Sequence, residues 1–191
     1  MDLAPPGIDE IMALTSIMEF LTQGYYHFFI LDSAPTGHLI RLLETPELID
    51  QWLKVFFNLF LKYKHIFRLP KISRQMVQMS KDLKVLRNLL KSNGSSALFG
   101  VTILNEMAFE ETRDLSDACK RLNVNMPLLF LNLATTTQSA CELCTAVCRR
   151  EKAIMLKYAQ AFPGQHQTLV YQRGEPRGIT YLEALGNALY K

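Results

Sequence analysis

Residues 29–38 read Phe-Ile-Leu-Asp-Ser-Ala-Pro-Thr-Gly-His, and this stretch carries the most information about the fold. An apolar run ends at Asp32, and a small turn that contains Pro35 and Gly37 follows at once. A buried parallel strand ends in this way when it delivers a carboxylate to the edge of an α/β sheet, where phosphate and magnesium chemistry takes place. The stretch therefore predicts an α/β fold with Asp32 at the carboxyl end of a strand.

Apolar, β-rich runs alternate with helical patterns along the chain, which is typical of a mainly parallel sheet. The predicted strands are approximately Tyr26–Leu31, Ala97–Leu104, Pro127–Leu133 and Gln167–Tyr171. The predicted helices are approximately Gly7–Thr22, Met107–Leu122, Ser139–Phe162 and Thr180–Tyr190, with a helix-rich insertion over 37–93. We therefore expect a mostly parallel sheet flanked by helices, with a helical insertion.

The composition is that of an ordinary globular protein, because 49% of the 191 residues are hydrophobic and 20% are charged. A net charge of +3 without a basic patch argues against binding to nucleic acid. The first residues lack the pattern of a signal peptide, and Trp52–Phe67 is too short and too charged to span a bilayer. We therefore expect a cytoplasmic protein whose cysteines are reduced thiols or metal ligands.

The opening stretch resembles the switch II motif Asp-Thr-Ala-Pro-Thr-Gly-His of the ArsA-type ATPases, which drive arsenical pumps and deliver tail-anchored membrane proteins. Only Ser33 departs from the motif, and serine keeps the hydroxyl group. The resemblance implies that Asp32 is catalytic and acts on the magnesium and attacking-water side of the γ-phosphate of ATP. From the residues alone, the alternative is that Asp32 caps the turn after it. The resemblance assigns these residues to switch II, whose turn rearranges with nucleotide state: Ser33, Ala34, Pro35, Thr36, Gly37 and His38.

A second match lies at Pro6-Gly7-Ile8-Asp9-Glu10, which is identical to a motif of the same family. The resemblance implies that Asp9 and Glu10 face the nucleotide site near a dimer interface. The residues alone are also explained as a plain helix N-terminus, since acidic side chains in the first turn interact favourably with the helix dipole.

Two further segments fit a nucleotide site. The run Leu129–Asn132 ends in an amide, which can offer both a donor and an acceptor to a base edge. The resemblance implies that Asn132 reads adenine and that Pro176 and Gly178 belong to the loop that closes over it. For that loop, the alternative is an ordinary turn before a helix. Glu106 is a weaker candidate, because Asn105 stands before it where the family often has proline.

Cys141 and Cys144 are spaced so that they can supply half of a tetrahedral zinc site. The resemblance implies a homodimer in which zinc is shared across the two-fold axis, and the alternative is a redox dithiol. Cys148 lies four residues after Cys144 and is either a third thiol or plain helix surface. Cys119 is predicted to be buried packing.

The insertion over 37–93 is rich in phenylalanine and methionine, at Phe56, Phe57, Phe60, Met76 and Met79. One interpretation is that these side chains form the core between two helices. The other is a partly exposed groove that accepts apolar helices of a client or membrane partner.

No Gly-x-x-x-x-Gly-Lys-[Ser/Thr] loop occurs in the sequence, although such a loop supplies most phosphate binding in this class of ATPase. We therefore expect residues 1–191 to be one incomplete ATPase domain, which lacks the N-terminal P-loop segment and is inactive alone. Its expected role is ATP-driven membrane-protein targeting or arsenite efflux. The lack of cysteine between Asp32 and Asn93 disfavours activation by metalloid. The alternative is a non-catalytic dimeric module that binds apolar helices.

Overall fold

The computed structural model describes residues 16–21, 23–24, 26–33, 36–62, 70–92, 94–136, 141–171 and 174–189. The chain divides into two compact units, Met1–Ser96 and Ala97–Lys191, and each is described by itself. The predictions made for Asp9, Glu10, Ala34 and Pro35 lie outside the described residues.

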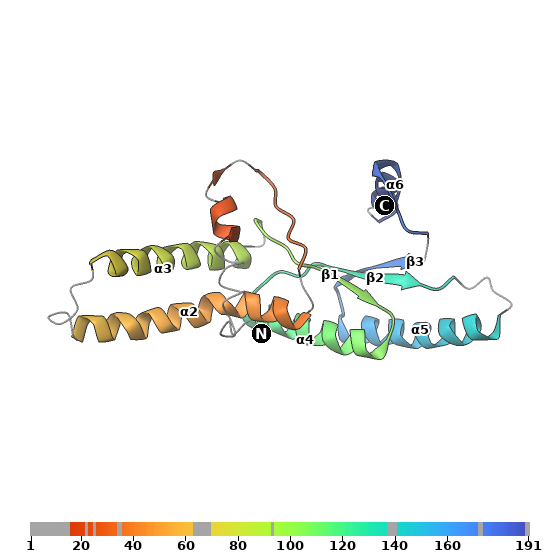
Figure 1. The fold of residues 1–191 in the computed structure, drawn as a ribbon. Coiled ribbons are helices and arrows are strands. Elements are labelled where there is room, and N and C mark those ends of the chain that lie inside the picture. The colour runs from red at the N-terminus through yellow and green to blue at the C-terminus, as the bar shows by residue number, and fades with distance from the viewer. Residues whose placement is uncertain are drawn as a thin grey trace, which may run out of the picture. The chain divides into compact units, whose positions relative to one another are not determined.

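The second unit is built on a parallel sheet. Its strands are β1 (Phe99–Ile103), β2 (Leu128–Ala134) and β3 (His166–Tyr171), in the order β1-β2-β3. The helices are α4 (Glu106–Leu122) between β1 and β2, α5 (Glu142–Ala161) between β2 and β3, and α6 (Ile179–Leu189) after β3 (Figure 1). Parallel neighbours need long crossover connections, and α4 and α5 provide them. The predicted α/β fold is confirmed.

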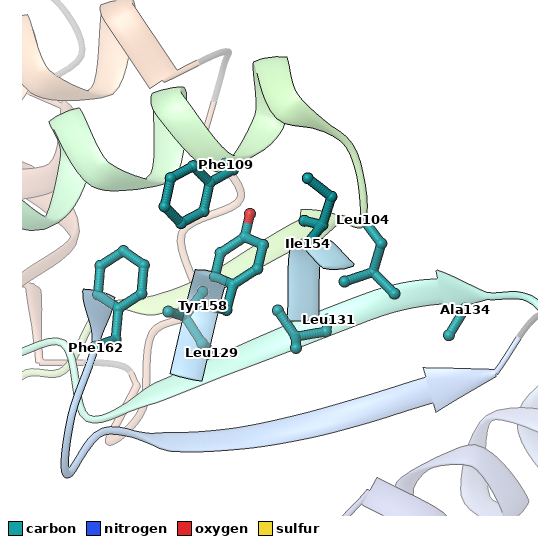
Figure 2. Close-up of a cluster of buried hydrophobic side chains, with 8 residues drawn as sticks. All are labelled: Leu104, Phe109, Leu129, Leu131, Ala134, Ile154, Tyr158 and Phe162. Carbon is teal, nitrogen blue, oxygen red and sulfur yellow. The ribbon is translucent and has the colours of Figure 1, made fainter. Parts of the chain in front are cut away.

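The core of the second unit lies between the sheet and the helices α4 and α5. Figure 2 shows its buried side chains, which are Leu104, Phe109, Leu129, Leu131, Ala134, Ile154, Tyr158 and Phe162. The rings of Phe109 on α4 and Tyr158 on α5 meet edge to face, with 5.0 Å between their centroids. Because both helices contribute to one cluster with β2, they cover the same face of the sheet.

Tyr158 carries a hydroxyl group into this core. Its oxygen lies 2.9 Å from Thr102 Oγ1 on β1 and 3.3 Å from Thr112 Oγ1 on α4. Thr112 Oγ1 also lies 2.7 Å from the carbonyl oxygen of Ala108. A buried polar group without a partner costs about 1–3 kcal/mol, and the three hydroxyl groups avoid that cost by bonding to one another and to the backbone. The network therefore ties α4, α5 and β1 together.

The first unit contains two long helices, α2 (Thr36–Lys62) and α3 (Pro70–Lys91), which occupy the stretch predicted as the insertion. They meet in a buried cluster of Leu53, Leu83 and Leu86. That the insertion lies within a single ATPase domain stays a prediction. Of the predicted helix near Gly7–Thr22, residues 16–21 are helical.

Phe57 and Met79 pack against this leucine cluster and are partly buried there. Their packing supports the interpretation of these two side chains as part of the contact between the two helices. The side chains of Phe56, Phe60 and Met76 lie outside the described ones.

The predicted strand Tyr26–Leu31 is wrong, because residues 26–31 form no strand in the structure. The side chains of Phe28 and Ile30 are 79% and 84% exposed. A strand forms only where a neighbouring strand pairs its N–H and C=O groups, and every strand among the described residues belongs to the second unit. An apolar run predicts that a segment can be buried, but it does not supply the pairing partner.

Candidate functional site

The carboxyl ends of the three parallel strands define one edge of the sheet in the second unit. Ile103 of β1 and Asn132 of β2 are register partners, so these two strands end nearly level. The loop with Glu175–Gly178 comes after β3. Ligands of open parallel sheets bind in the crevice outside the carboxyl ends of the strands. This edge is therefore the candidate site of the second unit.

Asn105, which directly follows β1, is the N-cap of α4. Its side-chain oxygen accepts a hydrogen bond of 2.8 Å from the backbone N–H of Ala108, and its backbone is extended. An Asn at this position satisfies a backbone donor that the helix itself leaves unpaired. The capping role explains why an Asn can stand here in place of a proline.

Glu106, the weaker sequence candidate, forms an ion pair with Lys157 on α5, with Nζ–oxygen distances of 2.5 and 2.8 Å. Both side chains are about half exposed, so screening by water limits the contribution to at most about 1 kcal/mol. The pair connects α4 to α5, and this gives Glu106 a structural role.

Asn132 lies beside an irregularity in β2. Leu131 pairs with Leu169 and Ala134 with Tyr171, so β2 has one residue more than β3 over this interval. Leu133 takes up the extra residue with φ 57°, a left-handed conformation that costs a non-glycine residue about 1–2 kcal/mol. Such a β-bulge re-aims the side chains around it and is common next to functional sites. Nothing in a Leu-Asn-Leu sequence signals this bulge.

The chain that leaves β2 is held by α5. The carboxylate of Glu151 accepts hydrogen bonds from the backbone N–H of Thr135 (2.8 Å) and from its hydroxyl group (2.9 Å). The thiol of Cys148, one turn earlier on α5, lies 3.8 Å from the carbonyl oxygens of Thr135 and Thr136. Sequence reasoning missed Glu151, because a single Glu on a helix gives no sign of a contact sixteen residues away.

Residues 174–178, which come after β3, are exposed. Gly178 has φ 83°, which favours glycine, and its carbonyl oxygen accepts a hydrogen bond of 3.1 Å from the N–H of Leu182 in the first turn of α6. Arg177 donates two hydrogen bonds to Glu175, of 2.7 and 3.0 Å. Pro176 and Gly178 therefore sit in the turn that starts α6, and their predicted role at adenine stays a prediction.

Asp32 and the switch residues belong to the first unit. Asp32 and Ser33 are exposed, and Thr36, Gly37 and His38 form the first turn of α2. The carboxylate thus stands just before a helix begins, as the sequence predicts, but not at the end of a paired strand.

Cys141 is the N-cap residue of α5, and Cys144 lies in the first turn. The backbone N–H of Cys144, its side chain and the N–H of Leu143 hold the pKa of the exposed Cys141 thiol below its ordinary value. The side chain of Cys119 is buried, which confirms its predicted packing role, and this burial raises the pKa of its thiol to about 11.

Within the described ranges, no three or more His, Cys, Asp or Glu side chains gather in a way that could hold a metal ion. A zinc ion shared between two chains needs only two thiolates from each, so the shared site stays a prediction. None of the described helices combines the length and apolar character needed to cross a membrane.

The chain is similar to proteins that are named as ATPases. The family model described as "Anion-transporting ATPase" matches residues 1–191. The chain is 24% identical to "ATPase ASNA1 homolog 2" of Paramecium tetraurelia, over 97% of this chain and 62% of that protein. It is 26% identical to "ATPase GET3C" of Arabidopsis thaliana, over 100% of this chain and 54% of that protein. It is 23% identical to "ATPase ARSA1" of Chlamydomonas reinhardtii, over 100% of this chain and 27% of that protein.

The chain belongs to the anion-transporting ATPase family, because the family model covers its whole length. It spans less than two thirds of the length of these relatives.

Proposed function

We propose that this member of the anion-transporting ATPase family forms part of an ATPase that couples ATP binding and hydrolysis to the handling of apolar membrane-protein helices. The observation that carries the proposal is a row of exposed apolar side chains on α2. The exposed fractions are 52% for Leu48, 71% for Trp52, 61% for Val55 and 52% for Leu59. We call this row the α2 stripe.

The α2 stripe lies on one side of the helix, because its members are spaced by four, three and four residues. Leu53 and Phe57, on another side, pack towards α3. The helix therefore carries more apolar surface than its contact with α3 uses. A contiguous apolar row with a Trp at its centre marks an interaction surface, and a partner helix with its own apolar row is the shape that fits it.

Each unit, taken by itself, carries side chains that suit one part of ATP and its magnesium ion. The exposed carboxylate of Asp32 is a hard oxygen donor of the kind that binds magnesium or its waters, and it would hold the attacking water. The half-buried amide of Asn132 and the exposed Pro176–Gly178 turn would hold the adenine. The 191 residues contain no Gly-Lys phosphate loop, so a segment other than these residues would bind the phosphates.

A homodimer that shares a zinc ion fits Cys141 and Cys144. Both thiols stand at the exposed start of α5, and thiolates are preferred zinc ligands. Two chains would each contribute two thiolates. Such a dimer would place two copies of the α2 stripe in one assembly.

The stripe is tested by binding of a fluorescent apolar helical peptide to the full chain. Trp52→Glu and Val55→Glu should each weaken binding at least about tenfold, because burial of such a side chain contributes about 1.5–3 kcal/mol. Both side chains are exposed, so the melting temperature should stay within a few degrees of the parent value.

The matched control is Asn58→Glu, which adds the same charge at an exposed polar position of α2 outside the stripe. It should leave peptide binding nearly unchanged. Equal losses in all three variants would point to a charge effect and contradict the proposed client surface. Peptide binding can also be measured with and without nucleotide on a protein in which the chain is completed with a phosphate loop. If the peptide still binds and nucleotide has no effect on binding, the non-catalytic module is favoured.

A further inference from the structure

The first two residues after β2, Thr135 and Thr136, contact the side chains of Glu151 and Cys148 on α5. The two carboxylate oxygens of Glu151 bind different groups of Thr135, with Oε2 on the N–H (2.8 Å) and Oε1 on the hydroxyl (2.9 Å). The Cys148 thiol adds contacts at 3.8 Å to the carbonyl oxygens of Thr135 and Thr136. This set of contacts is called the α5 clamp.

The α5 clamp acts on a segment whose conformation is otherwise costly. Leu133 adopts the left-handed conformation between Asn132 and the clamped Thr135. Such a backbone persists only where its surroundings hold it. On the sheet side, Ala134 is buried in the core. On the loop side, the described contacts that fix the backbone beyond the bulge are those from Glu151 and Cys148.

We propose that Glu151 is a positioning residue that sets the direction of the Asn132 side chain through the bulge at Leu133. This inference rests on the proposed role of Asn132 in reading adenine. A carboxylate that accepts two hydrogen bonds from one residue fixes both the position and the rotation of that residue. The backbone at Asn132, three residues earlier, is then held in one conformation, so that its Cα–Cβ bond keeps one direction at the sheet edge. Glu151 itself does not touch the nucleotide.

The test uses the full chain and two probes, AMP and GMP, titrated separately and followed by amide NMR shifts. Glu151→Ala should weaken AMP binding about fivefold to tenfold, because Asn132 is no longer held in position and about 1 kcal/mol of binding free energy is lost. The same variant should lower the preference for AMP over GMP. Glu151→Gln keeps one acceptor oxygen and should restore part of the preference. A merely structural role would change stability and leave the ratio of AMP to GMP affinity as it was.

The control variants distinguish the effect of losing the α5 clamp from the effects of losing Asn132 or an unrelated carboxylate. Glu110→Gln removes a carboxylate on α4 that pairs with Arg113 and should leave both affinities unchanged. Asn132→Ala should abolish the AMP preference, and Glu151→Ala added to it should cause no further loss. If Glu151→Ala fails to fold, Thr135→Val removes only the hydroxyl bond and should give a smaller loss in the same direction.

Two outcomes overturn different statements. If Asn132→Ala loses the AMP preference while Glu151→Ala keeps it, the positioning role of Glu151 is wrong and the proposed nucleotide edge stands. If the parent chain shows no preference for AMP, the proposed role of Asn132 is wrong, and the role of Glu151 falls with it.

Discussion

At the scale of single residues, Tyr158 decides how the second unit is packed. Its ring is fully buried against Phe109 and Phe162, and its hydroxyl group reaches Thr102 and Thr112. A phenylalanine would fill the same space without the oxygen. The hydroxyl group of the tyrosine thus adds directional hydrogen bonds to a contact that otherwise consists of apolar packing.

Tyr158→Phe should lower the free energy of unfolding by about 1 kcal/mol, measured by urea denaturation. The loss is small because the two threonine hydroxyls remain within hydrogen-bond distance of each other, at 3.0 Å. Tyr181→Phe on α6 is the matched control, since Tyr181 is 68% exposed. A loss above about 3 kcal/mol would mean that the hydroxyl network collapses as a unit.

At the scale of elements, the start of α5 combines two functions within a few turns. Its N-cap and first turn present Cys141 and Cys144 outwards. Its second and third turns hold the chain that leaves β2 through Cys148 and Glu151. A ligand bound by the first two thiols would therefore sit on the same helix that carries Glu151, the proposed positioning residue for Asn132.

Zinc at a two-fold interface should be detectable by metal analysis of the purified full chain, at one ion per two chains. Cys141→Ser and Cys144→Ser should each lower the zinc content and shift the chain towards monomer in sedimentation experiments, because each removes one of the two ligands per chain. Cys119→Ser is the control thiol, because it is buried away from this site. Dimers that persist without zinc would contradict the shared site.

At the scale of the whole molecule, the proposed ATPase needs more than these residues contain. The carboxylate of Asp32 has a γ-phosphate to act on only where a phosphate nest and a Lys hold that phosphate. The helical pair of the first unit and the sheet of the second unit fold around separate cores. The alternative, a non-catalytic binding module, would use the same α2 stripe. It differs from the ATPase only in that it needs no bound phosphate.

The 191-residue chain should show no magnesium-dependent ATP hydrolysis above background in a phosphate-release assay. Turnover that disappears with Asp32→Asn would show that the catalytic groups are complete within these residues and that the predicted need for a further segment is wrong. Glu110→Gln, which alters an exposed carboxylate outside the switch II stretch, serves as the control for nonspecific change.

Local patterns in the sequence were sufficient for the helices α4, α5 and α6 and for the three strands. β-rich apolar runs and the helical spacing of apolar residues are properties of short segments, so both can be recognised without knowing the tertiary contacts. The same holds for the helical pair over 37–93. Family membership also followed from short motifs, of which the stretch around Asp32 is the longest.

Tertiary structure alone decided the features that depend on a second segment. Residues 26–31 have the sequence of a buried strand, yet a strand needs a paired neighbour, and none is present in the first unit as described. Whether Phe57 and Met79 are groove or core depends on the partner across the helix pair. The bulge at Leu133 and the hydrogen bonds between Glu151 and Thr135 depend on how β2 packs with its neighbours. A hydrogen bond between segments that are distant in sequence leaves no local pattern from which it can be predicted.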